Sequence, residues 1–288
     1  MMPMQSSSMP LALVDDLRVA YHGHHGVTQA VRGVSFQLGR EKVGLVGESG
    51  CGKSTVGRAL LRLVPHPGVV SARRIEIAGT NILALSELDM RHLRGWRIAM
   101  ILQDPRFSLN PVMAVGRQIA EAWLAHFGGL KTEAIRRSLA ALQSVGFREP
   151  ERIARAYPHQ LSGGEGQRAM IAMMLIGEPG ILIADEPTSS LDVTVRNQVL
   201  AVLDDQMRRR GMGLLFISHD LNLVASFCER ILVMYGGQIV ENIKSAEIAQ
   251  ARHPYTRGLL DAQPRLDRTV LELPVVPRDP AWLAESSQ

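Results

Sequence analysis

The sequence predicts an α/β protein with a mostly parallel sheet that helices cover. Short apolar runs alternate with helical patterns along most of the chain, as in successive strand–helix–strand units. A glycine-rich segment, Gly47–Ser54, directly follows one of the apolar runs. From about residue 104 helical periodicity takes over, which indicates a helical insertion.

The elements can be placed in chain order from these periodicities. The predicted strands are short apolar or alternating runs at 11–20, 31–38, 42–46, 73–78, 97–102, 181–184 and 214–218. The main predicted helices have apolar residues at helical spacing and cover about 53–64, 112–127, 132–145, 152–157 and 193–210. Ser86, followed three residues later by Asp89, is a further helix start.

Composition limits the function classes. With 288 residues and 46% apolar content the chain can bury a substantial core. The net charge of +4 is small and spread out, so we expect no nucleic-acid partner. Neither a signal peptide nor an apolar run of membrane-spanning length is present, which predicts a soluble chain whose membrane role, if any, depends on partners.

Two segments carry the chemistry of phosphate binding and hydrolysis. Gly47–Ser54 fits G-x-x-x-x-G-K-[ST] between a predicted strand and a predicted helix, where backbone N–H groups and Lys53 can surround a phosphate. The strand at 181–184 ends in Asp185 and Glu186, one acid for a Mg²⁺ shell and one to orient or deprotonate water. Leu161–Glu165 opens another helix with Ser-Gly-Gly, a second anion site.

Seven motifs in this order resemble those of ABC transporter ATP-binding subunits over residues 11–262. Tyr21 matches the adenine-stacking aromatic residue, Gly47–Thr55 matches Walker A, and Gln103 matches the Q-loop glutamine. Leu161–Glu165 matches the signature, and Ile181–Glu186 matches Walker B. Ser190–Asp192 matches the D-loop, and His219 matches the switch histidine. The resemblance implies a P-loop NTPase (RecA-like) core with an N-terminal antiparallel β subdomain and an α-helical subdomain inserted at about 104–165. Residues 1–10 are expected to be disordered, and 263–288 form a Pro-rich tail.

The resemblance also implies residue roles. ATP would be held by Tyr21 and by the loop residues Gly47, Glu48, Ser49, Gly50, Cys51, Gly52, Lys53, Ser54 and Thr55. The catalytic residues would be Glu186, His219 and Gln103, and the Mg²⁺ ligands would be Ser54, Gln103 and Asp185. Two cassettes would pair head to tail, so that the residues acting in trans would be Ser162, Gly163, Gly164 and Asp192.

Finer motifs resemble the peptide and nickel importer subfamily: Gln103–Pro105 with Ser108–Pro111, Asp192–Val195 and His253–Thr256. This implies an ATP-hydrolysing subunit that energises import of di- or oligopeptides, nickel or metal chelates. Its partners would be a second, identical or homologous ATPase subunit, two membrane permeases and an extracytoplasmic binding protein, and it would lie peripherally on the cytoplasmic face of the membrane. Phe107 and Leu109 are candidates for the permease contact.

Two alternatives stay open. One is a soluble ABC-type ATPase of DNA repair or translation, although the segment between Gln103 and Leu161 is too short for the coiled coils of the repair relatives and the chain has a single cassette. The other is a scaffold that binds ATP without hydrolysing it, which the presence of Glu186, Gln103 and His219 disfavours. Gly166, inside the signature helix, departs from the subfamily pattern and costs about 1 kcal/mol of helix stability relative to Ala.

Overall fold

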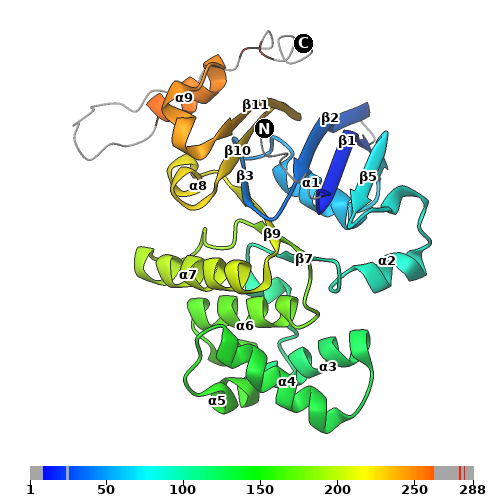
Figure 1. Ribbon diagram of the computed structural model, residues 1–288, viewed down its shortest axis with the longest axis vertical. Coiled ribbons are helices and arrows are strands. Elements are labelled where there is room, and N and C mark those ends of the chain that lie inside the picture. The colour runs from blue at the N-terminus through cyan, green and yellow to red at the C-terminus, as the bar shows by residue number, and fades with distance from the viewer. Residues whose placement is uncertain (1–8, 24–25, 263–278, 280–281, 283–288) are drawn as a thin grey trace, which may run out of the picture. The chain divides into compact units, whose positions relative to one another are not determined.

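The computed structural model describes residues 9–23, 26–262, 279 and 282. The chain forms two compact units that interleave along the sequence (Figure 1). Unit 1 comprises the described parts of Met1–Ala12, Leu38–Arg40 and Glu76–Leu214, and unit 2 those of Leu13–Gln37, Glu41–Ile75 and Leu215–Gln288. The predicted N-terminal disorder at 1–10 and the Pro-rich tail at 263–288 lie almost entirely outside the described residues.

Unit 2 contains two groups of strands. Strand β1 (Ala12–Gly23) pairs with β2 (Gly26–Leu38) and runs antiparallel to β4 (Gly68–Ser71). In the other group, β10 (Arg230–Tyr235) pairs in parallel with β3 (Lys42–Val46) and antiparallel with β11 (Gln238–Lys244). The helices of this unit are α1 (Lys53–Leu60), α8 (Leu221–Phe227), η4 (Ser245–Gln250) and α9 (Pro254–Asp261).

Unit 1 is centred on two parallel strands, β7 (Ile98–Ile101) and β8 (Ile181–Asp185). Every residue of both strands is buried, as their continuous apolar sequence predicts for strands covered on two faces. The longer helices α6 (Gly163–Leu175) and α7 (Val193–Arg210) belong to the same unit. Strand β9 (Gly213–Ser218) begins in unit 1 and continues into unit 2.

The smaller elements of unit 1 precede β7. Strand β5 (Arg74–Ile77) begins in unit 2 and ends in unit 1, where it turns back into β6 (Thr80–Asn81), with Ile77 opposite Thr80. The short helix η1 (Ile82–Ala84) leads to α2 (Glu87–Leu93). The predicted start of α2 is confirmed, because the Ser86 side chain accepts the Asp89 N–H (3.2 Å).

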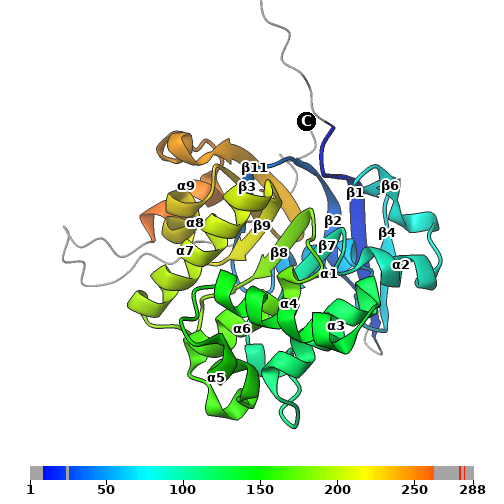
Figure 2. The ribbon, with the colours of Figure 1, turned by 60° about the horizontal axis from the view of Figure 1, so that its bottom comes forward.

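The segment after β7 is helical. It contains η2 (Pro105–Phe107), α3 (Val115–Phe127), α4 (Lys131–Ser144), α5 (Pro150–Arg155) and η3 (Pro158–Gln160), after which α6 begins. Figure 2 shows α3, α4, α5 and α6 grouped together, in green. Val115, Ile119, Leu142 and Ile153 supply buried apolar side chains to this group.

The predicted elements agree with the structure except at several ends. The predicted helix at 53–64 stops at Leu60, because Arg62 adopts a left-handed backbone (φ 52°) that ends the helix. The loop predicted between the first two strands is shorter, since β1 extends to Gly23 and β2 begins at Gly26. Strand β4 was not expected. Among the described residues, none of the helices is long and apolar enough to cross a bilayer.

Candidate active site

The glycine-rich loop of unit 2 connects the buried strand β3 to α1. Lys53, at the start of α1, is 4% exposed, and its ammonium donates to the carbonyl oxygens of Gly47 and Glu48, each at 2.8 Å. The loop therefore curves around the Lys53 ammonium. A positive charge held inside such a loop at a helix N-terminus is suited to an anion of high charge, and these residues fit a polyphosphate.

Two loop glycines are required by close backbone packing. A Cβ on Gly47 (φ 156°) would lie 2.2 Å from the Met234 carbonyl oxygen. A Cβ on Gly52 (φ 106°) would lie 2.3 Å from the Ala30 carbonyl oxygen. Neither distance can be relieved by a side-chain rotation, so any other residue would displace the loop.

Tyr255 of α9 contacts the backbone of the same loop. Its hydroxyl oxygen accepts the Glu48 N–H at 3.0 Å, and its ring packs on Tyr235 with a centroid distance of 4.6 Å. Tyr255 is fully buried, and burial raises the pKa of its phenol, so the hydroxyl stays neutral. Tyr255 belongs to the His253–Thr256 motif, but sequence reasoning missed its contact with the loop, because 207 positions separate it from Glu48 and no local pattern links them.

We expect Tyr255→Phe to lower ATP affinity several-fold and the free energy of unfolding by about 1 kcal/mol, because the part-buried Glu48 N–H loses its acceptor. Isothermal titration with ATP and urea unfolding measure the two effects. Tyr235→Phe is the matched control, since its hydroxyl donates to the Asp279 carbonyl (3.4 Å). An equal loss of ATP affinity in both variants would contradict a specific role for Tyr255.

The acidic residues of unit 1 stand at the end of β8. Asp185 is 5% exposed, and Glu186 follows with a left-handed backbone (φ 47°) that a non-glycine residue rarely adopts. Because β7 is parallel to β8, the residues after both strands lie at the same sheet edge. There the Gln103 Nε2 donates to Glu186 Oε2 (3.5 Å) and to Ser189 Oγ (3.2 Å). The structure thus brings together two of the three predicted catalytic residues.

The signature segment begins α6, also in unit 1. Ser162 is the N-cap: its hydroxyl accepts the Glu165 N–H (3.3 Å), while Glu165 Oε2 accepts the Ser162 N–H and hydroxyl, each at 3.0 Å. Ser162 and Gly163 line a cleft of about 490 Å³. Gly164 is buried against Val195 of α7, whose N–H donates to the Asp192 side chain at 3.0 Å. The segments around Ser162 and Asp192 are therefore neighbours, and Ser162 opens onto a cleft.

Replacing two glycines of α6 by Ala should change the free energy of unfolding in opposite directions. A Cβ on Gly164 would lie 2.3 Å from a Val195 methyl, so we expect Gly164→Ala to lower the free energy of unfolding by about 1–3 kcal/mol. A Cβ on Gly166 would lie 3.4 Å from Pro105, an ordinary contact, so Gly166→Ala should raise it by about 0.5–1 kcal/mol. Urea unfolding of both variants measures the difference; destabilisation by Gly166→Ala would contradict this account.

The remaining predicted site residues lie in unit 2. His219 is exposed, directly after β9, and precedes Asp220, which caps α8 through the Leu223 N–H (3.0 Å). Tyr21 is half-buried near the end of β1, opposite Gly68 of β4. The predicted permease contact needs a correction at one residue: Leu109 is 3% exposed and packs inside unit 1, so it offers no surface to a partner. The Phe107 side chain lies outside the described part of the structure.

The loop around Lys53 and the acids after β8 define a P-loop nucleoside triphosphatase. A model of the family described as "ABC transporter" matches residues 31–189, and the chain belongs to this family. It is an ATP-binding, ATP-hydrolysing cassette. The alternative of a DNA-repair ATPase finds no support.

Several known proteins resemble the chain over most of its length. It is 46% identical to the probable peptide ABC transporter ATP-binding protein y4tR of Sinorhizobium fredii, covering 91% of this chain and 80% of that one. It is 43% identical to the oligopeptide transport ATP-binding protein OppD of Bacillus subtilis, covering 93% and 76%. Among solved structures, the dimeric cassette MJ0796 bound to ADP and Pi matches with a TM-score of 0.71 at 25% identity, covering 81% and 98%.

Proposed function

We propose that this chain hydrolyses ATP to drive the import of di- or oligopeptides through membrane subunits that are separate chains. The observation that carries the proposal is identity of 43% and 46%, over more than nine-tenths of the chain, to proteins named for peptide transport. Nickel or a metal chelate is the second cargo class, suggested by the subfamily motifs alone. Peptides are favoured because the similar proteins named above are peptide transport proteins.

Two cassettes would pair head to tail around ATP. The loop around Lys53 would bind the phosphates, Tyr21 the adenine, and Ser162, Gly163, Gly164 and Asp192 would reach the ATP of the partner cassette. A dimeric ADP-bound relative of the same fold supports this arrangement. Glu186 would accept a proton from the attacking water, with Gln103 and His219 beside the reaction. Mg²⁺ would neutralise phosphate charge, held by the oxygen ligands of Ser54, Gln103 and Asp185.

The assembly would contain this chain, a second identical or homologous ATPase, two permeases and an extracytoplasmic binding protein. The ATPases would lie peripherally on the cytoplasmic face of the membrane, with no nucleic acid involved. The cassette would span 11–262, with the helical subdomain at 104–165 forming part of the permease contact.

Affinity purification of the tagged chain from gently solubilised membranes tests this assembly. We expect two permeases, a second ATPase and a binding protein to copurify, and the binding protein to bind dipeptides or oligopeptides in a ligand screen. Copurification with ribosomes or DNA from the soluble fraction would overturn the transport assignment. A binding protein selective for nickel would overturn the peptide cargo and leave the ATPase assignment in place.

A further inference from the structure

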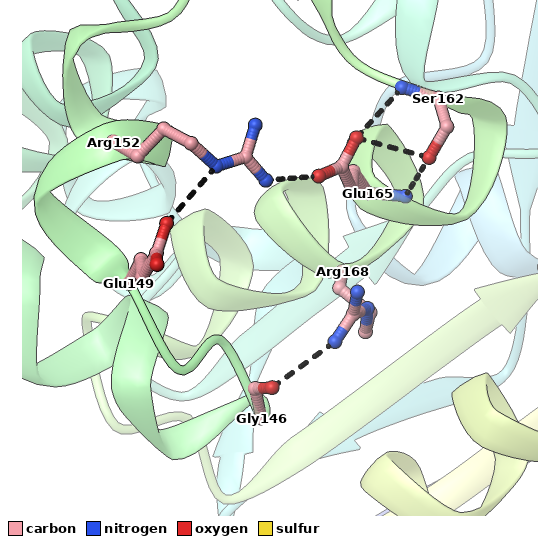
Figure 3. Close-up of polar contacts among 6 residues, drawn as sticks. All are labelled: Gly146, Glu149, Arg152, Ser162, Glu165 and Arg168. Carbon is pink, nitrogen blue, oxygen red and sulfur yellow. Dashed lines mark hydrogen bonds and ion pairs between the residues drawn. The ribbon is translucent and has the colours of Figure 1, made fainter.

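Glu165 places a carboxylate at the proposed γ-phosphate contact. Figure 3 shows its side chain folded back onto Ser162, where Oε2 accepts both the backbone N–H and the hydroxyl hydrogen of that residue. The hydroxyl has one hydrogen, and in the structure Glu165 receives it. A phosphate oxygen approaching Ser162 would therefore meet a competing acceptor that carries the same sign of charge.

Glu165 keeps this charge at neutral pH. Burial acts to raise the pKa of its carboxyl group, but hydrogen bonds from the Ser162 N–H and from Arg152 outweigh burial, and the pKa lies below its ordinary value. The repulsion between Glu165 and a phosphate therefore persists at neutral pH unless a cation offsets it.

Arg152 of α5 is the cation that contacts Glu165. Its guanidinium forms a close ion pair with the Glu165 Oε1, the carboxylate oxygen that does not contact Ser162. Arg168, on α6 itself, interacts with the Glu165 charge only through space: its guanidinium donates to the Gly146 carbonyl (3.2 Å) and stacks on the Phe147 ring (4.3 Å), as Figure 3 shows for the carbonyl contact. The Glu165 side chain is 21% exposed and the Arg152 side chain 56%, so water partly screens this pair and breaking it should have a modest effect.

We propose that Arg152 is a positioning residue of the signature: it holds the Oε1 oxygen of Glu165 and neutralises the carboxylate, so that a γ-phosphate competing for the Ser162 hydroxyl meets less negative charge. This inference rests on the proposed function, in which Ser162 contacts the ATP of the partner cassette. It links α5 of the helical segment electrostatically to the nucleotide, because Arg152 acts on the phosphate contact through Glu165.

A double-mutant cycle tests the link in the copurified transporter carrying Glu186→Gln, with radiolabelled ATP binding as the readout. Arg152→Ala should raise the half-saturating ATP concentration about fivefold, since Glu165 loses its counter-charge. Glu165→Gln alone should change it less than about twofold, because the amide oxygen can still accept from Ser162. Arg152→Ala combined with Glu165→Gln should bring it back within about twofold of the parent, since residue 165 then carries no charge and Glu149, which Arg152 also contacts (3.7 Å), has a side chain that is 77% exposed to water.

Arg155→Ala is the matched control, because Arg155 is an exposed arginine on the same helix; it should bind ATP like the parent. Arg152→Lys should retain most of the affinity. In the transporter that retains Glu186 and therefore hydrolyses ATP, kcat and KM are measured separately. Arg152→Ala should raise KM more than it lowers kcat.

Two results overturn the inference: no effect of Arg152→Ala, or an equal effect whether residue 165 is Glu or Gln, which would mark a purely structural role for Arg152. Lys53→Ala, run in the same titration, separates this failure from failure of the proposed function. If Lys53→Ala abolishes ATP binding while the cycle shows no coupling, the Arg152 proposal fails alone. If Lys53→Ala binds ATP normally, the proposed nucleotide site itself is wrong.

Discussion

Replacing Glu186 by Gln is expected to lower the rate of ATP hydrolysis about 10²–10⁴-fold, while ATP binding is kept. Gln has the same shape and can remain beside Gln103, whose amide lies 3.5 Å from Glu186 Oε2, but it cannot accept the proton of an attacking water. Glu186 directly follows a fully buried strand, so the sheet positions its backbone, which is left-handed (φ 47°).

Phosphate release at saturating ATP and equilibrium ATP binding measure the two effects of Glu186→Gln. Glu178→Gln is a close control, since Glu178 is an exposed glutamate that also has a left-handed backbone (φ 55°). It should hydrolyse ATP at the parent rate. Near-normal turnover by Glu186→Gln would remove Glu186 from its catalytic role.

The second large effect is expected from Lys53→Ala, which should weaken ATP binding about 100-fold or more. The Lys53 ammonium is buried inside the loop. Because little water reaches it there, water competes weakly with a charged hydrogen bond from Lys53 to a phosphate. Its removal also takes one donor from each of the Gly47 and Glu48 carbonyls, although the Glu48 carbonyl keeps the Cys51 N–H (3.3 Å), so the loop loses internal support as well as charge.

ATP titration calorimetry measures this loss, with circular dichroism to verify that the variant is folded. Lys42→Ala is the control: Lys42 begins β3, the strand that leads into the loop, and its ammonium stacks on the Phe227 ring (4.9 Å). It should bind ATP normally. A folded Lys53→Ala protein with undiminished ATP affinity would refute the phosphate-loop assignment.

Local sequence patterns predicted much of the fold and site because the relevant forces act over a few residues. The strand at Lys42–Val46 and the helix at Val193–Arg210 were predicted with the observed limits, since apolar runs and periodicity determine them. Gln103 and Glu186 were each assigned to the site from their own motifs, and the structure shows them in contact because the parallel neighbouring strands β7 and β8 end at the same sheet edge.

The contacts that sequence reasoning missed join distant segments. Tyr255 supports the Glu48 N–H from 207 positions away, and Arg152 reaches Glu165 from a different helix. Each pair depends on how helices pack in three dimensions, which periodicity does not specify. Leu109 shows the converse error: its place just after the Q-loop suggested an exposed contact, but its side chain is buried.

The most direct test of the central claim is ATP-driven uptake of a labelled dipeptide or oligopeptide by the copurified complex in proteoliposomes. The binding protein is added on the extracytoplasmic side, and ATP is supplied on the side of this chain. We predict uptake that requires ATP, is lost with Glu186→Gln and is kept with Glu178→Gln. Peptide uptake that continues unchanged with Glu186→Gln would contradict the claim that ATP hydrolysis by this chain powers transport.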